Sequence, residues 1–250
     1  MREGFRIYDS HAHLGVSLHS GRVHTLESVL RDMDRAGVDR ALLMPFPLVE
    51  DFRAAHAQIA RAVRAHPDRL AGAASLNPFI PEPEFRHEVR RCADEYGFRA
   101  LKLQPQYQPL NPISSRSDFF FGAALEHRLA VICHTGAGAP FALPSLFILP
   151  ARKFPELRFV LAHAGGGLYA AEAAVAAVVC PNVYLELSWL VPHQVRMVLQ
   201  HVPPSRLMIG SDVPENLEVE FTKILGLDLP PEAKQAILWD TAAAVFAPQP

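Results

Sequence analysis

Two patterns of hydrophobic and polar residues alternate along the chain. Short apolar runs rich in β-branched or aromatic residues are typical of buried strands, and each is followed by a longer stretch whose apolar residues recur at helical spacing. The predicted strands are residues 5–9, 40–44, 70–75, 99–104, 130–134, 157–163, 182–187 and 206–210. The predicted helices are residues 25–36, 51–65, 82–96, 118–127, 146–153, 168–179, 193–201, 217–225 and 231–246.

Eight strand-then-helix units in 250 residues predict an α/β protein with the (β/α)8 TIM barrel fold, as a single domain over residues 1–250. The alternation makes the strands parallel, because each helix is a crossover connection. An open doubly wound sheet is the alternative. No glycine-rich phosphate-binding motif follows the first strand, which weakens that alternative.

Composition excludes several classes of partner. The chain has 24 basic and 26 acidic residues, with no basic tract, so we expect no nucleic acid and no anionic membrane as partner. No signal peptide and no membrane-spanning apolar run is visible. Three distant cysteines argue against a disulfide framework and favour a cytoplasmic protein. Twelve histidines are many for this length.

Polar residues with metal-binding or proton-transfer chemistry stand at the predicted carboxyl ends of the strands, where TIM barrels carry their active sites. His11 and His13 follow the first strand two positions apart, and alternate strand residues point to the same side. Converging neutral imidazoles suit a transition metal. The later strands end in Lys102 and Gln104 (fourth), His134 (fifth), His163 (sixth), Glu186 (seventh) and Asp212 (eighth).

A single histidine at a strand end is more often structural than a ligand. Four histidines and one aspartate at corresponding ends of four strands favour a metal site. The remaining histidines receive other interpretations. His19 and His24, with Arg22, lie in the first loop, which overhangs the predicted site and offers weak candidates for substrate contact. Helical positions predict solvated side chains for His56, His66, His87, His127, His193 and His201.

The motifs at the strand ends resemble those of a known family. Asp-Ser-His-Ala-His at residues 9–13, Cys-His-Thr-Gly at 133–136, Leu-Ala-His-Ala-Gly-Gly at 161–166 and Ile-Gly-Ser-Asp-Val-Pro at 209–214 resemble the amidohydrolase superfamily. They are most similar to its amidohydrolase-related branch, which includes decarboxylases of the aminocarboxymuconate-semialdehyde type and many hydrolases. Two positions depart from the usual pattern: Asp240 stands where the family usually has Asn, and Gln104 where it often has His.

The resemblance implies roles for individual residues. His11, His13, His134 and Asp212 would bind the metal, and Asp212 would also handle protons. His163 would lie near the metal, either as a ligand or, as this branch favours, as a base or electrophilic partner for the bound water. The implied cofactor is one zinc ion per chain, with manganese or another divalent metal as alternatives. Family likeness alone suggests a homodimer.

Lys102 has two interpretations under this resemblance. In binuclear members of the superfamily, a strand-four lysine is carboxylated and bridges two metals. The branch that this sequence resembles is usually mononuclear, which favours one metal and a secondary role for Lys102. The candidate substrate-binding residues are Lys102, Gln104, Arg22 and Glu186.

Three functions remain open. A metal ion lowers the pKa of bound water from ~15.7 towards ~7, so the first prediction is a metal-dependent hydrolase of a small ester, lactone or amide substrate. The alternative is a metal-dependent, non-oxidative decarboxylase of a small unsaturated or aromatic acid. A metal-binding barrel without activity ranks third, because such a protein has no need of the proton-handling Asp212.

Overall fold

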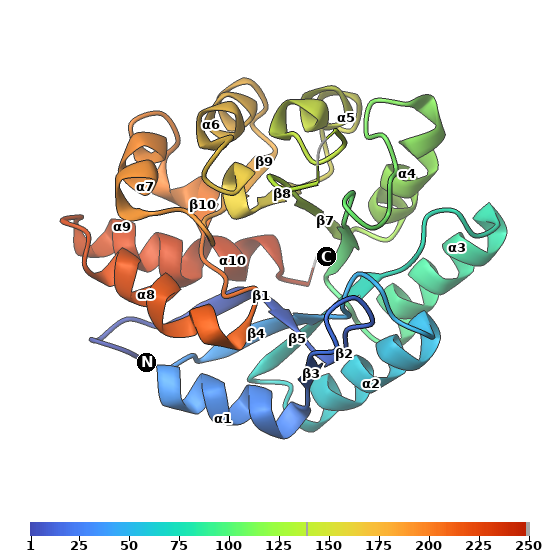
Figure 1. Cartoon of the computed structure of the whole chain (residues 1–250), viewed down its shortest axis with the longest axis horizontal. Coiled ribbons are helices and arrows are strands. Elements are labelled where there is room, and N and C mark those ends of the chain that lie inside the picture. The colour runs from blue at the N-terminus through green and yellow to red at the C-terminus, as the bar shows by residue number, and fades with distance from the viewer. Residues whose placement is uncertain (139, 249–250) are drawn as a thin grey trace.

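The short apolar runs of the sequence form parallel strands that stand side by side in chain order (Figure 1). The computed structural model describes residues 1–138 and 140–248. Its eight-stranded sheet consists of β1 (Tyr8–His13), β4 (Arg40–Met44), β5 (Leu70–Ser75), β6 (Ala100–Leu103), β7 (Ala130–His134), β8 (Phe159–Ala162), β9 (Val183–Glu186) and β10 (Leu207–Met208). The predicted TIM barrel is confirmed.

The first and last strands approach each other and nearly close the barrel. The Ser10 backbone N–H donates to the Ile209 carbonyl at 3.0 Å, and the Asp212 N–H donates to the His11 carbonyl at 2.7 Å. Asp9 reinforces this junction, because its carboxylate accepts the Ser211 N–H at 2.9 Å and the Ser211 hydroxyl at 2.6 Å. Residues from opposite ends of the sequence thus meet beside the predicted site.

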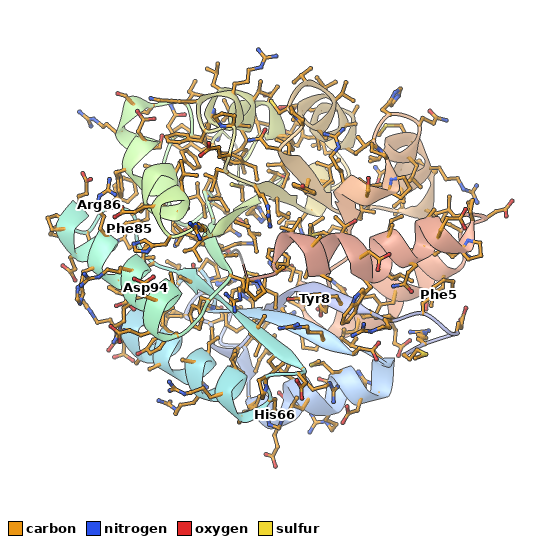
Figure 2. The ribbon with its side chains drawn as sticks, turned by 180° about the vertical axis from the view of Figure 1, so that it is seen from behind. Phe5, Tyr8, His66, Phe85, Arg86 and Asp94 are labelled. Carbon is orange, nitrogen blue, oxygen red and sulfur yellow. The ribbon has the colours of Figure 1, made fainter. Side chains whose placement is uncertain are left out.

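Side chains alternate between the barrel interior and the surrounding helices, as the two-residue period of strands requires. Tyr8, Leu42, Ile132 and Met208 belong to the inner cluster. Figure 2 shows Tyr8 towards the middle of the barrel, whereas His66 lies at the outer edge of the molecule. Small alanines fill much of the remaining interior. A larger apolar cluster occupies the space between strands and helices.

The amphipathic stretches form the helices that surround the sheet. They are α1 (Leu26–Ala36), α2 (Phe52–Ala65), α3 (Glu82–Arg90), α4 (Asp118–Glu126), α5 (Ile148–Lys153), α6 (Ala170–Val179), α7 (Pro192–Leu199), α8 (Leu217–Leu225), α9 (Pro231–Gln235) and α10 (Thr241–Val245). Thr25 caps α1 by accepting the Ser28 N–H, and Gly37 ends it at a φ of 71°. In the described part of the chain, no helix has the length and apolarity needed to cross a membrane.

A small hairpin interrupts the first strand-to-helix connection. Its strands β2 (Gly15–Val16) and β3 (Val23–His24) pair antiparallel, and their loop carries His19 and Arg22. The prediction that this connection overhangs the strand ends agrees with its place on the cavity wall.

The prediction that His56 is solvated was wrong. This side chain is fully buried on α2; its Nδ1 lies 2.7 Å from Glu88 Oε1, and its Nε2 contacts the backbone N and O of Ser75. His56 lies three and four positions before the buried Ile59 and Ala60, so helical spacing alone places it on the inward face. It joins α2 and α3 to the carboxyl end of β5.

Candidate active site and metal centre

His11 and His13 project from β1 towards Asp212, which lies in the loop after β10. The Nε2 atoms of both imidazoles are 3.4 Å from Asp212 Oδ1. Both histidines are buried, and Asp212 is partly exposed with a backbone φ of 63°. A left-handed conformation costs a non-glycine residue free energy, so this loop holds the carboxylate towards β1 at a cost in backbone strain.

Hydrogen bonds to Nδ1 assign the tautomers of these two histidines. His11 Nδ1 lies 3.2 Å from Glu186 Oε2, and His13 Nδ1 lies 3.0 Å from the Pro45 carbonyl. Both partners are acceptors, so each Nδ1 carries the proton and each Nε2 presents a lone pair to Asp212 Oδ1. Two lone pairs and a carboxylate oxygen repel one another unless a cation lies among them; the ammonium of Lys102 contacts one of these lone pairs, that of His11 Nε2, and a metal ion could contact all three atoms.

His134 and His163 add two more imidazoles from the ends of β7 and β8. His134 Nε2 donates to the Ala137 carbonyl at 2.7 Å, and its buried Nδ1 has no hydrogen-bond partner among the described residues. His163 Nδ1 donates to the Ser188 hydroxyl at 2.7 Å, which leaves its Nε2 unprotonated. The His163 ring centroid is 5.0 Å from that of His11 and 4.9 Å from that of His134.

Glu186 lies behind the histidines and orients two of them. Its Oε2 accepts from His11 Nδ1, from the His163 backbone N–H at 3.1 Å and from the Ser188 hydroxyl at 2.8 Å. The oxygen of the Ser188 hydroxyl in turn accepts the hydrogen bond from His163 Nδ1. Carboxylates that hold the far nitrogen of a histidine fix its ring and tautomer. The structure places Glu186 outside the cavity wall, with 1% of its surface exposed.

Lys102 lies beneath the same histidines. It is buried, and its Nζ is 3.0 Å from His11 Nε2, to which it donates. Burial lowers the pKa of Lys102 to about 8, against the opposing attraction of Asp212 and Glu186. A metal ion on His11 Nε2 would take the lone pair that this hydrogen bond uses.

Burial and neighbouring charges keep His11, His134 and His163 neutral and Asp212 ionised. Burial lowers the pKa of His134 to about 4, with a further contribution from Lys102, and it holds the pKa of His11 and His163 well below the ordinary value. Burial would raise the pKa of Asp212, but its polar contacts with His163, His13 and His11 outweigh burial and hold this pKa well below its usual range. Neutral imidazoles and an ionised carboxylate are the protonation states that metal ligation requires.

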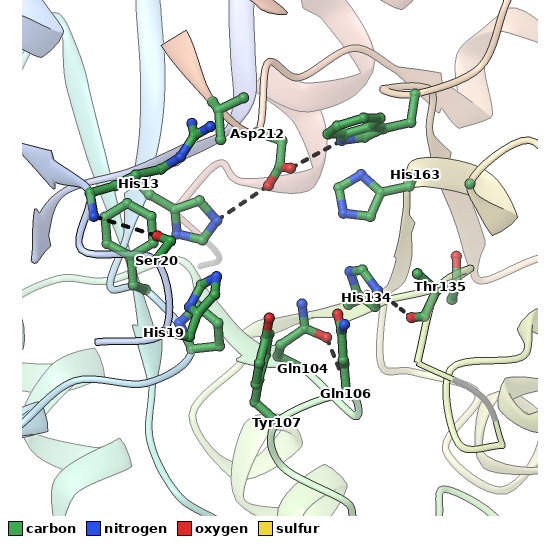
Figure 3. A pocket seen from close by; sticks show the side chains of 17 residues that line it. His13, His19, Ser20, Gln104, Gln106, Tyr107, His134, Thr135, His163 and Asp212 are labelled. Carbon is green, nitrogen blue, oxygen red and sulfur yellow. Dashed lines mark hydrogen bonds and ion pairs between the residues drawn. The ribbon is translucent and has the colours of Figure 1, made fainter. Parts of the chain in front are cut away.

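A cavity of about 400 Å³ opens above these residues (Figure 3). His13, His134, His163 and Asp212 reach its surface, and Gln104 and Arg22 also line it. His11, Lys102 and Glu186 lie beneath this surface. The cavity therefore contacts two of the four predicted substrate-binding residues.

Several residues of the site were assigned no role from the sequence. Phe46, Tyr107 and Trp189 form aromatic parts of the wall. Asp9 accepts the His11 N–H at 3.1 Å besides its bonds to Ser211, and burial raises its pKa to about 7. The sequence offered one indication that Asp9 belongs to the site, namely that it begins the motif that contains His11 and His13.

The donor set fits a divalent metal ion. Ligand atoms of His11, His13 and Asp212 lie within 4.8 Å of one another. His134 lies outside this group of three, and its buried, unpartnered Nδ1 is available for a further ligand bond. Imidazole nitrogen and carboxylate oxygen are donors that zinc and manganese accept.

Comparison with known proteins identifies the family. The family model described as Amidohydrolase matches residues 8–247, and the chain belongs to this family. It is therefore a metal-dependent enzyme of the amidohydrolase superfamily. No curated protein sequence matches the chain.

Solved structures share the fold at low identity. A 5-carboxyvanillate decarboxylase from Novosphingobium aromaticivorans, complexed with manganese, is 18% identical with a TM-score of 0.78, over 98% of this chain and 97% of that one. A 2,6-dihydroxybenzoate decarboxylase is 15% identical with a TM-score of 0.72, over 97% and 98%. A probable 2-pyrone-4,6-dicarboxylic acid hydrolase from Acinetobacter baumannii is 16% identical with a TM-score of 0.69, over 97% and 99%.

Proposed function

We propose that the protein is a metal-dependent decarboxylase of a small aromatic or unsaturated carboxylic acid. The observation that carries this proposal is the composition of the cavity wall. Candidate metal ligands, flat aromatic rings and the guanidinium of Arg22 line the same cavity of about 400 Å³. This choice reverses the order expected from the sequence, where hydrolysis ranked first, because decarboxylases are prominent among the structurally similar proteins.

The size and walls of the cavity suit a planar substrate. Volumes of roughly 300–1,000 Å³ are typical of small-molecule sites. Phe46, Tyr107 and Trp189 offer aromatic surfaces to a ring. The Gln104 and Gln106 amides offer hydrogen bonds to ring hydroxyls, which a hydroxybenzoate would carry.

Arg22 supplies positive charge at the cavity wall. Its Nη1 contacts both carboxylate oxygens of Glu215, at 3.1 and 3.0 Å. The side chains are 43% and 65% exposed, so solvent screens this ion pair and it contributes little stability. A substrate carboxylate can therefore replace Glu215 on Arg22 at small cost.

The metal ligands would be His11, His13, His134 and Asp212, with one ion per chain. A bound divalent ion supplies positive charge that orients the substrate's oxygen atoms and stabilises negative charge developing on them. Zinc is the metal expected from the sequence, and the manganese complex of a structurally similar decarboxylase makes manganese an equal candidate.

Asp212 is the proton carrier of the proposed reaction. Decarboxylation breaks the bond between a ring carbon and the carboxylate, CO₂ leaves without the bonding electrons, and the carbon takes a proton. Asp212 is ionised, so it first accepts a proton from a substrate hydroxyl or from solvent and then delivers it to that carbon. His163 Nε2, held unprotonated by the Nδ1 bond to Ser188, is a second acceptor at the same wall.

Hydrolysis is the second candidate. The observation that favours it is the same pair of proton acceptors, Asp212 and His163, which could activate water against an ester or lactone. A probable hydrolase of a pyrone dicarboxylic acid has the same fold.

The test combines metal content with a substrate panel. Protein purified without chelator is assayed for metal and incubated with manganese or zinc and with hydroxybenzoic acids, unsaturated dicarboxylic acids, lactones and esters. We expect CO₂ release and about one metal per chain. The Asp212→Asn variant tests the proton carrier, and Arg86→Met, which alters a partly exposed arginine of α3 that does not line the cavity, is the control. Turnover of lactones or esters without CO₂ release would establish the second candidate instead.

A further inference from the structure

Trp189 contacts the proposed proton carrier directly. Its indole Nε1–H donates to Asp212 Oδ2 at 3.0 Å (Figure 3). The other oxygen, Oδ1, faces His11 and His13. The two oxygens of this carboxylate therefore have different partners, one an indole and the other the histidine pair of β1.

The backbone around Trp189 is held by a buried ion pair on α8. The Trp189 N–H donates to Glu220 Oε1 at 2.9 Å. Glu220 pairs with Lys223, whose Nζ donates to the carbonyls of Leu187 at 2.7 Å and Leu190 at 2.8 Å. Both charged side chains are buried, with 3% and 8% of their surfaces exposed. The pair thus bonds to three backbone groups of residues 187–190 and orders this loop. These bonds also offset part of the cost of burying the two charges.

Trp189 also has a strained backbone and an unusual exposure. Its φ is 65°, in the left-handed region that a bulky residue rarely adopts. More than half of its surface is exposed, so little burial energy compensates for the strain. Strain of this kind persists where surrounding structure imposes it, and here Glu220 and Lys223 impose it.

We propose that Trp189 is a positioning residue for Asp212. Its indole N–H occupies Oδ2, so the carboxylate offers Oδ1 to the metal ligands of β1 and cannot rotate away from them. Glu220 and Lys223 act through the loop of residues 187–190 to hold the indole in place. The inference rests on the metal centre of the proposed function and makes no use of which reaction follows.

The competing interpretation treats Trp189 only as a wall of the cavity. A wall residue affects how tightly substrate binds, but it does not change the affinity of the protein for metal. A residue that orients a ligand changes metal affinity before any substrate is present. Metal binding therefore separates the two interpretations.

The first experiment measures manganese binding to Trp189→Phe, which keeps an aromatic ring and loses the N–H. Removing a group that orients a metal ligand typically weakens binding by roughly 10–100-fold, so we expect a manganese Kd about 10-fold higher than that of the wild type. The matched control is Trp239→Phe, the same substitution in the only other tryptophan of the chain. Trp239 packs against Tyr8 and Arg6 at the opposite end of the barrel, and its variant should bind manganese like the wild type.

The second experiment uses the same variants as single-tryptophan proteins. Manganese is paramagnetic and quenches nearby indole fluorescence. Emission of Trp189, observed in Trp239→Phe, should fall as manganese binds, and emission of Trp239, observed in Trp189→Phe, should change far less. Electron paramagnetic resonance of free manganese confirms how much metal is bound in each sample.

The outcomes distinguish this inference from the proposed reaction. An unchanged manganese Kd in Trp189→Phe, or unquenched Trp189 emission in metal-loaded protein, would overturn the positioning role. Wild-type protein that binds manganese, responds to Trp189→Phe as expected and turns over no carboxylic acid would support the positioning role while refuting the decarboxylase. A wild type that binds no divalent metal would overturn both.

Discussion

Replacing Lys102 by methionine should stabilise the metal-free protein. Lys102 is 2% exposed, and its burial lowers its pKa from 10.5 to about 8. Lowering a pKa by one corresponds to about 1.4 kcal/mol, so the folded state carries a penalty of about 3 kcal/mol for holding this lysine charged. Methionine has a similar volume and no charge. The lost hydrogen bond to His11 offsets about 1 kcal/mol, which leaves a net gain of about 2 kcal/mol.

The sign of the pH dependence follows from linkage. Between the folded pKa of about 8 and the unfolded value of 10.5, the unfolded state binds more protons, so wild-type stability rises with pH in this window. The penalty is fully present below pH 8 and is relieved as the pH approaches 10.5. The advantage of Lys102→Met should therefore be largest near pH 7 and small near pH 10.

Chemical denaturation in the presence of a chelator, at pH 7 and pH 10, measures the net gain in stability and its dependence on pH. Thermal unfolding provides a second measurement of the gain. For a chain of 250 residues, a gain of about 2 kcal/mol corresponds to a Tm increase of roughly 4–8 °C. The difference between variant and wild type isolates Lys102 between pH 7 and pH 10, because the imidazoles that its charge affects, His11 and His134, are neutral in the folded protein throughout this range. A variant that is less stable than the wild type at pH 7, or a difference that does not shrink by pH 10, would refute the reasoning.

Three further predictions concern the site and the core. Asp212→Asn should lower kcat by at least about 10³-fold while leaving the circular dichroism spectrum unchanged, because proton transfer and metal ligation both lose their carboxylate; retained turnover would remove Asp212 from the mechanism. Arg22→Met should raise KM for carboxylate substrates about 10-fold with little change in kcat, and Glu215→Gln, which removes the partner of Arg22 and keeps the arginine, is the comparison variant. Equal KM values for wild type and Arg22→Met would exclude Arg22 from substrate binding. Gly72→Ala should destabilise the fold by about 1–3 kcal/mol in urea titrations, because the added Cβ would lie 2.4 Å from the Phe98 ring, and an unchanged midpoint would contradict this packing.

The fold could be predicted because its signals are local and repeated. Each apolar run and each amphipathic stretch carries its own periodicity, and connection rules then leave few arrangements. The ends of β10 show the limit of this method. Residues 206–210 read as a strand, but only Leu207–Met208 pairs with β9, because the next residues turn towards β1 and into the site.

The site could be predicted in part for the same reason. Once the strands are parallel and ordered, His134, His163 and Asp212 must gather near His11 and His13. What the sequence did not reveal depends on backbone geometry that no local pattern encodes. Trp189 reaches Asp212 through a left-handed φ, and Glu186 turns to the back of His11 because its partners are backbone groups and a serine hydroxyl.

The junction of β1 and β10 has a consequence for the order of events during biosynthesis. His11 and His13 leave the ribosome early, whereas Ser211 and Asp212, which hold them in the finished barrel, are separated from them by about two hundred residues of chain. Contacts across such a separation form late, because the entropy of closing the intervening loop must be overcome first. Until the eighth strand arrives, β1 has an unpaired edge and the proposed set of metal ligands is incomplete. The capacity to bind metal should consequently be among the last properties that the newly made chain acquires.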